Sequence, residues 1–186
     1  MNVYDFDNTI YRGDSTADFY IFCLKRHKKN ILKVPSLVFG AVKFYVFKKG
    51  TKTDFKQNMY KFLKAVNYPE DLEDFWNTHK SNIKDWYIKQ QKADDVIISA
   101  SPYFLLEPIC KELGIKHLIA SNVDKNTGIY TGINCHGKEK VRLFNINFPK
   151  ENIDKFYSDS KSDTPLAEIA EKAFIVHGDD IKPWDF

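Results

Sequence analysis

Apolar residues recur with helical spacing through the first half of the chain, after one short apolar run at residues 2–4. They fall three or four positions apart, with breaks at 50–51 and 68–69, and include Phe19, Phe22, Cys23, Phe39, Val42, Phe55, Met59, Phe62, Leu72, Phe75, Trp76, Ile83, Trp86 and Tyr87. This spacing gathers side chains on one face of a helix. The pattern predicts an all-helical segment at residues 14–91 that opens with a Ser-x-x-Asp capping box at Ser15 and Asp18.

The pattern changes at Asp94, where short apolar runs replace the helical spacing. Residues 96–98 are fully apolar, as in a buried parallel strand, and further runs predict strands at 117–120, 153–158 and 173–176. Between them we expect a hairpin at 123–130, a weak helix near 141–144 and a helix at 165–170. Pro102 at a first helical position predicts another helix, with Ser101 as its better N-cap and Gly114 as its stop. Alternating strands and helices predict a parallel α/β sheet.

Composition agrees with a folded chain of 186 residues, either one domain or one domain with a sizeable insertion. Apolar residues make up 43% of the sequence and aromatic residues 15%, enough for a buried core. Cys23, Cys110 and Cys135 have no metal-ligand spacing, which favours buried free thiols in a reducing cytoplasm. Acidic residues within the first ten positions argue against a signal peptide, so we expect a cytoplasmic protein.

Charge is unevenly distributed, although the formal net charge is only +3. The basic block, residues 25–64, holds twelve Lys and Arg residues and the single acid Asp54. It is interpreted either as the solvated face of amphipathic helices or as a surface that attracts an anionic substrate or an anionic membrane. The apolar stretch 31–47 within it is interrupted by Lys33, Pro35 and Lys43, which argues against a membrane-spanning helix.

Polar residues follow directly on three predicted strands, which makes them candidates for chemistry. Asp5, Ser99 and Asp159 occupy these positions, and ligands of open α/β sheets bind beyond the carboxyl ends of the strands. Asp5 and Asp7 project from the same side of an extended segment. Two adjacent carboxylates there suggest phosphoryl transfer, with one attacking and the other shuttling a proton.

Four segments in order, 5–10, 96–102, 137–141 and 157–166, resemble the motifs of the haloacid dehalogenase (HAD) superfamily, subclass IB, the phosphoserine phosphatase-like branch. The resemblance implies an α/β, HAD-like Rossmannoid three-layer core with a parallel sheet. Residues 1–13 and 92–186 would form this core, and residues 14–91 would form an inserted helical C1-type cap. A nucleic-acid binder or an inactive phosphoester-binding protein would share the basic surface without needing this ordered set of residues.

The resemblance also implies catalytic roles. Asp5 becomes an aspartyl-phosphate, Asp7 protonates the leaving alcohol and then activates water, and Ser99 hydrogen-bonds the phosphoryl oxygens. A lysine neutralises charge on the nucleophile and the phosphate. Lys138 is favoured by its spacing to the following aliphatic residue, and Lys140 stays open as the alternative.

The expected cofactor is Mg²⁺, because the available donors are hard oxygens. The resemblance implies ligation by the Asp5 carboxylate, the Asp7 backbone carbonyl and the Asp159 carboxylate. Asp163 would bind the metal through water or tether the lysine. The similar pattern at residues 174–180 leaves no room for a following helix, so Asp179 and Asp180 are assigned to a terminal turn.

Asn8, Asp14 and Ala100 are the residues expected to contact substrate. Asn8 stands where glycine or serine is commoner in the branch, and Asp14 occupies the place where phosphoserine phosphatases carry a glutamate for the substrate amine. Asp14 can equally serve as a helix cap. The expected partner is a small phosphorylated metabolite rather than nucleic acid. A phosphatidylglycerophosphate-type lipid is the alternative substrate, because the basic block would suit peripheral contact with an anionic membrane.

Overall fold

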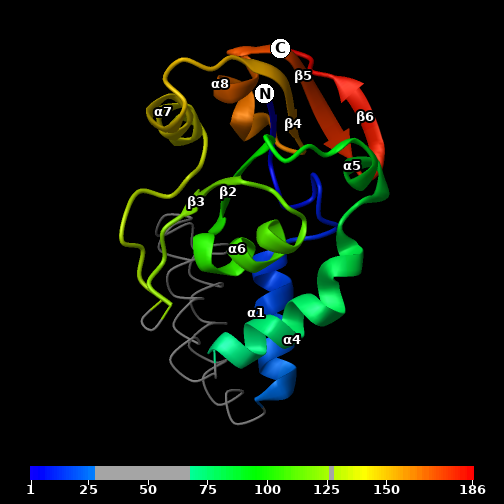
Figure 1. The fold of residues 1–186 in the computed structure, drawn as a ribbon, viewed down its shortest axis with the longest axis vertical. Coiled ribbons are helices and arrows are strands. Elements are labelled where there is room, and N and C mark those ends of the chain that lie inside the picture. Colours follow the sequence, from blue (N-terminus) through cyan, green and yellow to red (C-terminus); the bar gives the residue numbers. More distant parts are fainter. Residues whose placement is uncertain (28–67, 126–127) are drawn as a thin grey trace, which may run out of the picture.

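The computed structural model describes residues 1–27, 68–125 and 128–186, and Figure 1 shows their arrangement. The strands are β1 (Asn2–Tyr4), β2 (Val96–Pro102), β3 (His117–Ser121), β4 (Ile153–Ser158), β5 (Ala170–His177) and β6 (Asp180–Pro183). The helices are α1 (Ser15–Arg26), α4 (Tyr68–His79), η3 (Lys80–Asn82), α5 (Asp85–Gln90), α6 (Tyr103–Glu112), α7 (Lys138–Asn147), η4 (Lys161–Asp163) and α8 (Thr164–Ala167).

The strands form one six-stranded sheet in the order β3-β2-β1-β4-β5-β6. All neighbouring strands are parallel except β5 and β6, which form an antiparallel pair. The short strand β1 lies between β2 and β4, so the residues that follow it lie between the ends of two longer strands. The expected α/β class with a mostly parallel sheet is confirmed.

Hydrophobic residues cover both faces of the sheet, because successive strand residues point to opposite sides. Val3 packs in a cluster with Phe144 of α7 and Leu166 of α8. Tyr4 packs in the other cluster with residues of α1, α4, α5 and α6. The sheet is therefore buried between two layers, as expected for parallel strands.

The described parts of the predicted helical segment are helical and contact the core. Helices α1 and α4 lie side by side, with the Phe19 and Phe75 rings 5.2 Å apart between centroids (Figure 1). From α4, the Trp76 indole donates to the Leu105 carbonyl of α6 at 2.7 Å. Residues 28–67, and with them most of the basic block and the apolar stretch 31–47, lie outside the described residues. No helix in the described ranges is long and apolar enough to cross a membrane.

Two predicted helix starts are wrong. Asp14, rather than Ser15, is the N-cap of α1, and its carboxylate accepts from the Ala17 amide at 3.0 Å. The Asp18 carboxylate instead accepts a hydrogen bond from the Tyr11 hydroxyl at 2.8 Å. Helix α6 begins at Tyr103, after Pro102 as its N-cap, with no side-chain capping bond from Ser101.

The C-terminal region also differs from the prediction. Helix α8 ends at Ala167 and β5 begins at Ala170, so the sequence pattern overestimated the helix and underestimated the strand. Asp179 lies in the turn between β5 and β6, as expected, but Asp180 is the first residue of β6. Strand β6 was missed because its four residues are all exposed and lack a buried apolar face.

Candidate active site

The carboxyl ends of β2, β1 and β4 meet at a cavity of about 350 Å³. It is lined by Asp5, Asp7, Asn8, Asp14, Ser99, Ala100, His136, Lys140, Asp159, Ser160, Ser162 and Asp163. The Asp5 amide donates to the Tyr157 carbonyl of β4 at 2.9 Å, which continues the β1–β4 pairing to the residue that enters the cavity. The structure thus brings together all the predicted site residues except Lys138.

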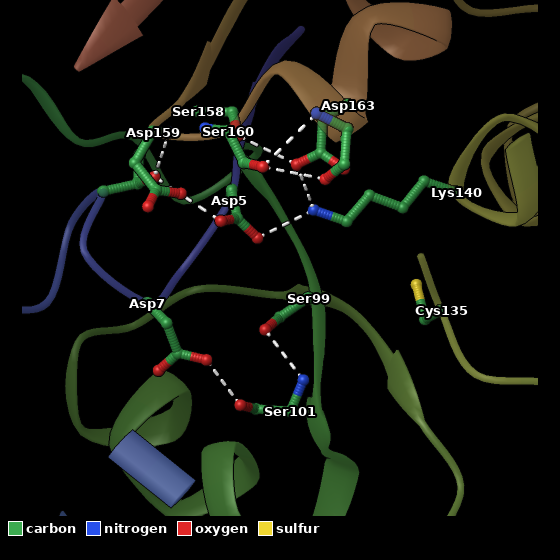
Figure 2. A network of polar contacts seen from close by, with 12 residues as sticks. Asp5, Asp7, Ser99, Ser101, Cys135, Lys140, Ser158, Asp159, Ser160 and Asp163 are labelled. Carbon is green, nitrogen blue, oxygen red and sulfur yellow. Dashed lines mark hydrogen bonds and ion pairs between the residues drawn. The ribbon is translucent and has the colours of Figure 1, made fainter. Parts of the chain in front are cut away.

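Lys140 lies at the centre of the charged residues. Its ammonium group donates to Asp5 Oδ1 at 2.7 Å and to Asp163 Oδ2 at 2.6 Å, and the side chain is 2% exposed (Figure 2). The prediction that Lys138 occupies this place is wrong, since Lys138 is exposed at the first position of α7. Residues two positions apart on a helix point about 200° apart, so only one of these lysines can face the cavity.

Asp163 holds the lysine, one of the two roles expected for it. Besides Lys140, its Oδ2 atom accepts from the Ser158 hydroxyl at 2.8 Å. Its Oδ1 atom is buried and has no hydrogen-bond partner within the described residues. Ser158, the last residue of β4, therefore contacts the carboxylate that holds the lysine.

Asp7 is bound on the side of the cavity formed by α1 and β2. Its Oδ1 atom accepts from the Ser15 amide at 2.8 Å. Its Oδ2 atom accepts from the Ser101 hydroxyl at 2.5 Å (Figure 2). The Ser101 hydroxyl also lies 2.9 Å from the Thr16 hydroxyl. Sequence reasoning missed this role of Ser101, because a serine before a proline is also a helix-capping signal.

The cavity is strongly acidic, and burial raises the pKa values of Asp7 and Asp159. Partial burial, reinforced by the nearby charge of Asp14, raises the pKa of Asp7 to about 7. Burial and the carboxylates of Asp5 and Asp163 raise the pKa of Asp159 to about 6. For Lys140, burial alone would lower the pKa, but Asp5 and Asp163 raise it well above its usual value. Lys140 therefore stays charged, but its single positive charge does not neutralise all the carboxylates around it.

The donor set fits a hard divalent cation such as Mg²⁺. Across the described ranges, no three acidic, histidine or cysteine side chains converge on one point. A site made from the Asp5 and Asp159 carboxylates and a backbone carbonyl at Asp7 does not need three such side chains. Mg²⁺ usually keeps several waters, and the unpartnered Asp163 Oδ1 atom can accept from one of them. Excess negative charge among these oxygens favours the same cation.

A second buried lysine supports the loop that carries Asp7 and Asn8. The Lys84 ammonium group donates to the Asn8 carbonyl at 2.6 Å and to the Gly178 carbonyl at 2.5 Å. Asn8 has a φ of 56°, a left-handed conformation that is uncommon for residues other than glycine. Sequence reasoning gave no signal for Lys84, because its partners are backbone atoms.

The alternative acidic motif lies outside the cavity. Asp179 forms an exposed ion pair with Arg12 at 2.9 Å. Asp159 lines the cavity, and its amide donates to the buried Thr9 hydroxyl at 2.9 Å. Residues 157–166, rather than residues 174–180, therefore contribute carboxylates to the cavity.

A comparison with known proteins shows the family to which the chain belongs. The family model for haloacid dehalogenase-like hydrolases matches residues 3–168. The chain belongs to this family. Among solved structures, a protein of unknown function from Bordetella pertussis superposes with a TM-score of 0.74 at 20% identity, covering 93% of this chain and 87% of that one. A probable phosphoserine phosphatase from Vibrio cholerae has a TM-score of 0.68 at 10% identity, covering 92% and 55%.

Curated relatives carry phosphatase names. A probable phosphatase of Mycobacterium tuberculosis is 32% identical over 94 residues, which are 46% of this chain and 32% of that protein. A phosphoserine phosphatase of the same organism is 23% identical over 199 residues, covering 95% of this chain and 64% of that protein. The chain therefore spans less than two thirds of the length of either relative.

Proposed function

We propose that this protein is a Mg²⁺-dependent phosphomonoesterase that works through an aspartyl-phosphate on Asp5. The observation that carries the proposal is the placement of Asp5. Its carboxylate lies at the end of β1, with Oδ1 held by Lys140, in a cavity that also contains Ser99 and Asp159. A carboxylate fixed in this way is available to attack a phosphorus atom.

Asp5 and Asp7 take different roles because their surroundings differ. Burial raises the pKa of Asp5, but the paired Lys140 ammonium group opposes this shift and favours the carboxylate that attacks the phosphoryl group. Among the described residues, none of the cationic side chains is bonded to the Asp7 carboxylate, and its pKa of about 7 suits proton transfer near neutral pH. In the first step the Asp5–phosphorus bond forms as the ester bond breaks, and Asp7 gives its proton to the leaving oxygen. In the second step the water oxygen bonds to phosphorus as the Asp5–phosphorus bond breaks, Asp7 takes a proton from that water, and phosphate is released.

Lys140 and Ser99 are proposed to stabilise the phosphoryl oxygens during both steps. Lys140 supplies a fixed positive charge, and the Ser99 hydroxyl lines the same cavity. Mg²⁺ would be held by the Asp5 and Asp159 carboxylates and the Asp7 carbonyl. When bound, it would neutralise charge on the phosphoryl oxygens.

The proposed substrate class is a small phosphorylated metabolite. A cavity of about 350 Å³ accommodates a phosphoryl group with a small alcohol, and Asn8, Asp14 and Ala100 line its wall. Phosphoserine is a reasonable first candidate, since relatives of this chain carry the name phosphoserine phosphatase. Asp14 also caps α1, so its carboxylate does not depend on a substrate amine for a partner.

Phosphate release from a panel of phosphometabolites, with Mg²⁺ and with EDTA, tests this proposal. We expect turnover of at least one small phosphomonoester that EDTA abolishes and added Mg²⁺ restores. Asp5→Asn is the matched control, because the amide has nearly the same shape but cannot attack. Turnover in Asp5→Asn equal to that of the native protein would contradict the proposal.

A further inference from the structure

The Asp7 carboxylate is held by two donors from separate parts of the chain. One is the Ser15 amide at the start of α1, and the other is the Ser101 hydroxyl at the end of β2. The second donor is connected further, because the Ser101 and Thr16 hydroxyls are 2.9 Å apart. Thr16, Ser101 and Asp7 thus form a continuous hydrogen-bonded chain between α1 and the sheet.

The two donors hold the carboxyl group by both of its oxygens. The Ser15 amide binds Oδ1 and the Ser101 hydroxyl binds Oδ2, so the carboxyl group cannot rotate without losing both contacts. The Thr16 hydroxyl lies within hydrogen-bond distance of the Ser101 hydroxyl and helps to orient it.

Helix capping does not explain the buried hydroxyl of Ser101. The residue is 1% exposed, yet it does not cap α6, whose N-cap is Pro102. Its amide donates to the Ser99 hydroxyl at 3.1 Å, a contact that any residue except proline could make. Within residues 1–27, 68–125 and 128–186, its hydroxyl contacts Asp7 and Thr16.

We propose that Ser101 is a positioning residue for the proton transfers of Asp7, with Thr16 as its hydroxyl partner. This inference rests on the proposed function, since it assigns to Asp7 the roles of acid and base. Ser101 does not need to touch substrate. It fixes the orientation of the carboxyl group through its contact with Oδ2.

The test separates the two chemical steps with two substrates in the full chain. p-Nitrophenyl phosphate has a leaving group that needs little protonation, so forming the phosphoenzyme from it does not depend on Asp7 as an acid. Phosphoserine, an alkyl ester, needs that proton. Hydrolysis of the phosphoenzyme needs Asp7 as a base with both substrates. The measurements are turnover and the fraction of protein phosphorylated at steady state, by acid quench and mass spectrometry.

Ser101→Ala should lower turnover of phosphoserine about tenfold to a hundredfold, the range for losing a hydrogen bond to a charged group. With p-nitrophenyl phosphate, the phosphorylated fraction should rise, because its formation is spared and its hydrolysis is not. Ser101→Thr keeps the hydroxyl and should restore both values. Thr16→Val should change them in the same direction by a smaller factor.

Ser121→Ala is the matched control. Ser121 is also a buried serine at a strand end, and its hydroxyl bonds Asn134 and the Cys135 amide rather than Asp7. It should not raise the phosphorylated fraction, and thermal melting should show all variants folded. A Ser101→Ala protein that loses activity equally on both substrates, with an unchanged phosphorylated fraction, would overturn the inference. A native protein without turnover or phosphoenzyme would overturn the proposed function as well.

Discussion

Replacing Lys140 by methionine removes the ammonium group that lies between Asp5 and Asp163. Both contacts are short, at 2.7 and 2.6 Å, and both carboxylates are buried. Removing one partner of a buried ion pair typically destabilises a protein by about 3–5 kcal/mol, because the remaining charge is left without compensation. In the metal-free protein we therefore expect Lys140→Met to lower the free energy of unfolding by about 3–5 kcal/mol.

Lys138→Met provides the matched control two residues away. Lys138 is exposed on the same helix, and its substitution should change stability by about 0.5 kcal/mol or less. Urea denaturation in EDTA, followed by circular dichroism, measures both values. Phosphate release with Mg²⁺ should be lost in Lys140→Met and retained in Lys138→Met.

A double-mutant cycle with Asp163→Asn isolates the interaction. If Lys140 and Asp163 act as a pair, the double variant should be more stable than the sum of the two single effects implies, by about 0.5–3 kcal/mol. Equal losses in Lys138→Met and Lys140→Met, or strict additivity in the cycle, would refute the assignment of Lys140 as the central cation of the cavity.

Two further substitutions test the metal site and the loop beneath it. Asp159→Ala should abolish Mg²⁺-dependent phosphate release, whereas Asp179→Ala should retain most of it, since Asp179 lies outside the cavity in an exposed ion pair with Arg12. An inactive Asp179→Ala protein would show that the wrong acidic motif was chosen. Lys84→Met should lower the free energy of unfolding by about 1–3 kcal/mol for each carbonyl that loses its donor. The control Lys89→Met, at an exposed position, should stay within about 0.5 kcal/mol of the native protein by urea denaturation. Equal effects at the two positions would contradict the role given to Lys84.

Features set by local sequence were predictable. Asp5, Ser99 and Asp159 each follow an apolar run in the sequence, and they line one cavity because parallel strands bring their carboxyl ends to one edge. The helical pattern of α1 and α4 was also visible in the spacing of apolar residues. Both predictions depend only on residues close together in the chain.

Features set by the rotation of a helix or by distant parts of the chain could not be predicted from the sequence. The choice between Lys138 and Lys140 depends on the rotation of α7, which follows a left-handed Gly137 with a φ of 58°. Ser101 contacts Asp7 across 94 positions of sequence. Lys84 binds the backbone carbonyls of Asn8 and Gly178, and the pattern of side chains in the sequence does not predict where these carbonyls lie.

The identity of the phosphorylated residue tests the account most directly. The native protein, mixed with p-nitrophenyl phosphate and Mg²⁺ and quenched in acid, should yield a peptide that carries one phosphoryl group on Asp5. The Asp5→Asn protein should yield none and should release no phosphate. Phosphate on Ser99 or on a histidine, or a fully active Asp5→Asn protein, would contradict the proposed aspartyl-phosphate mechanism.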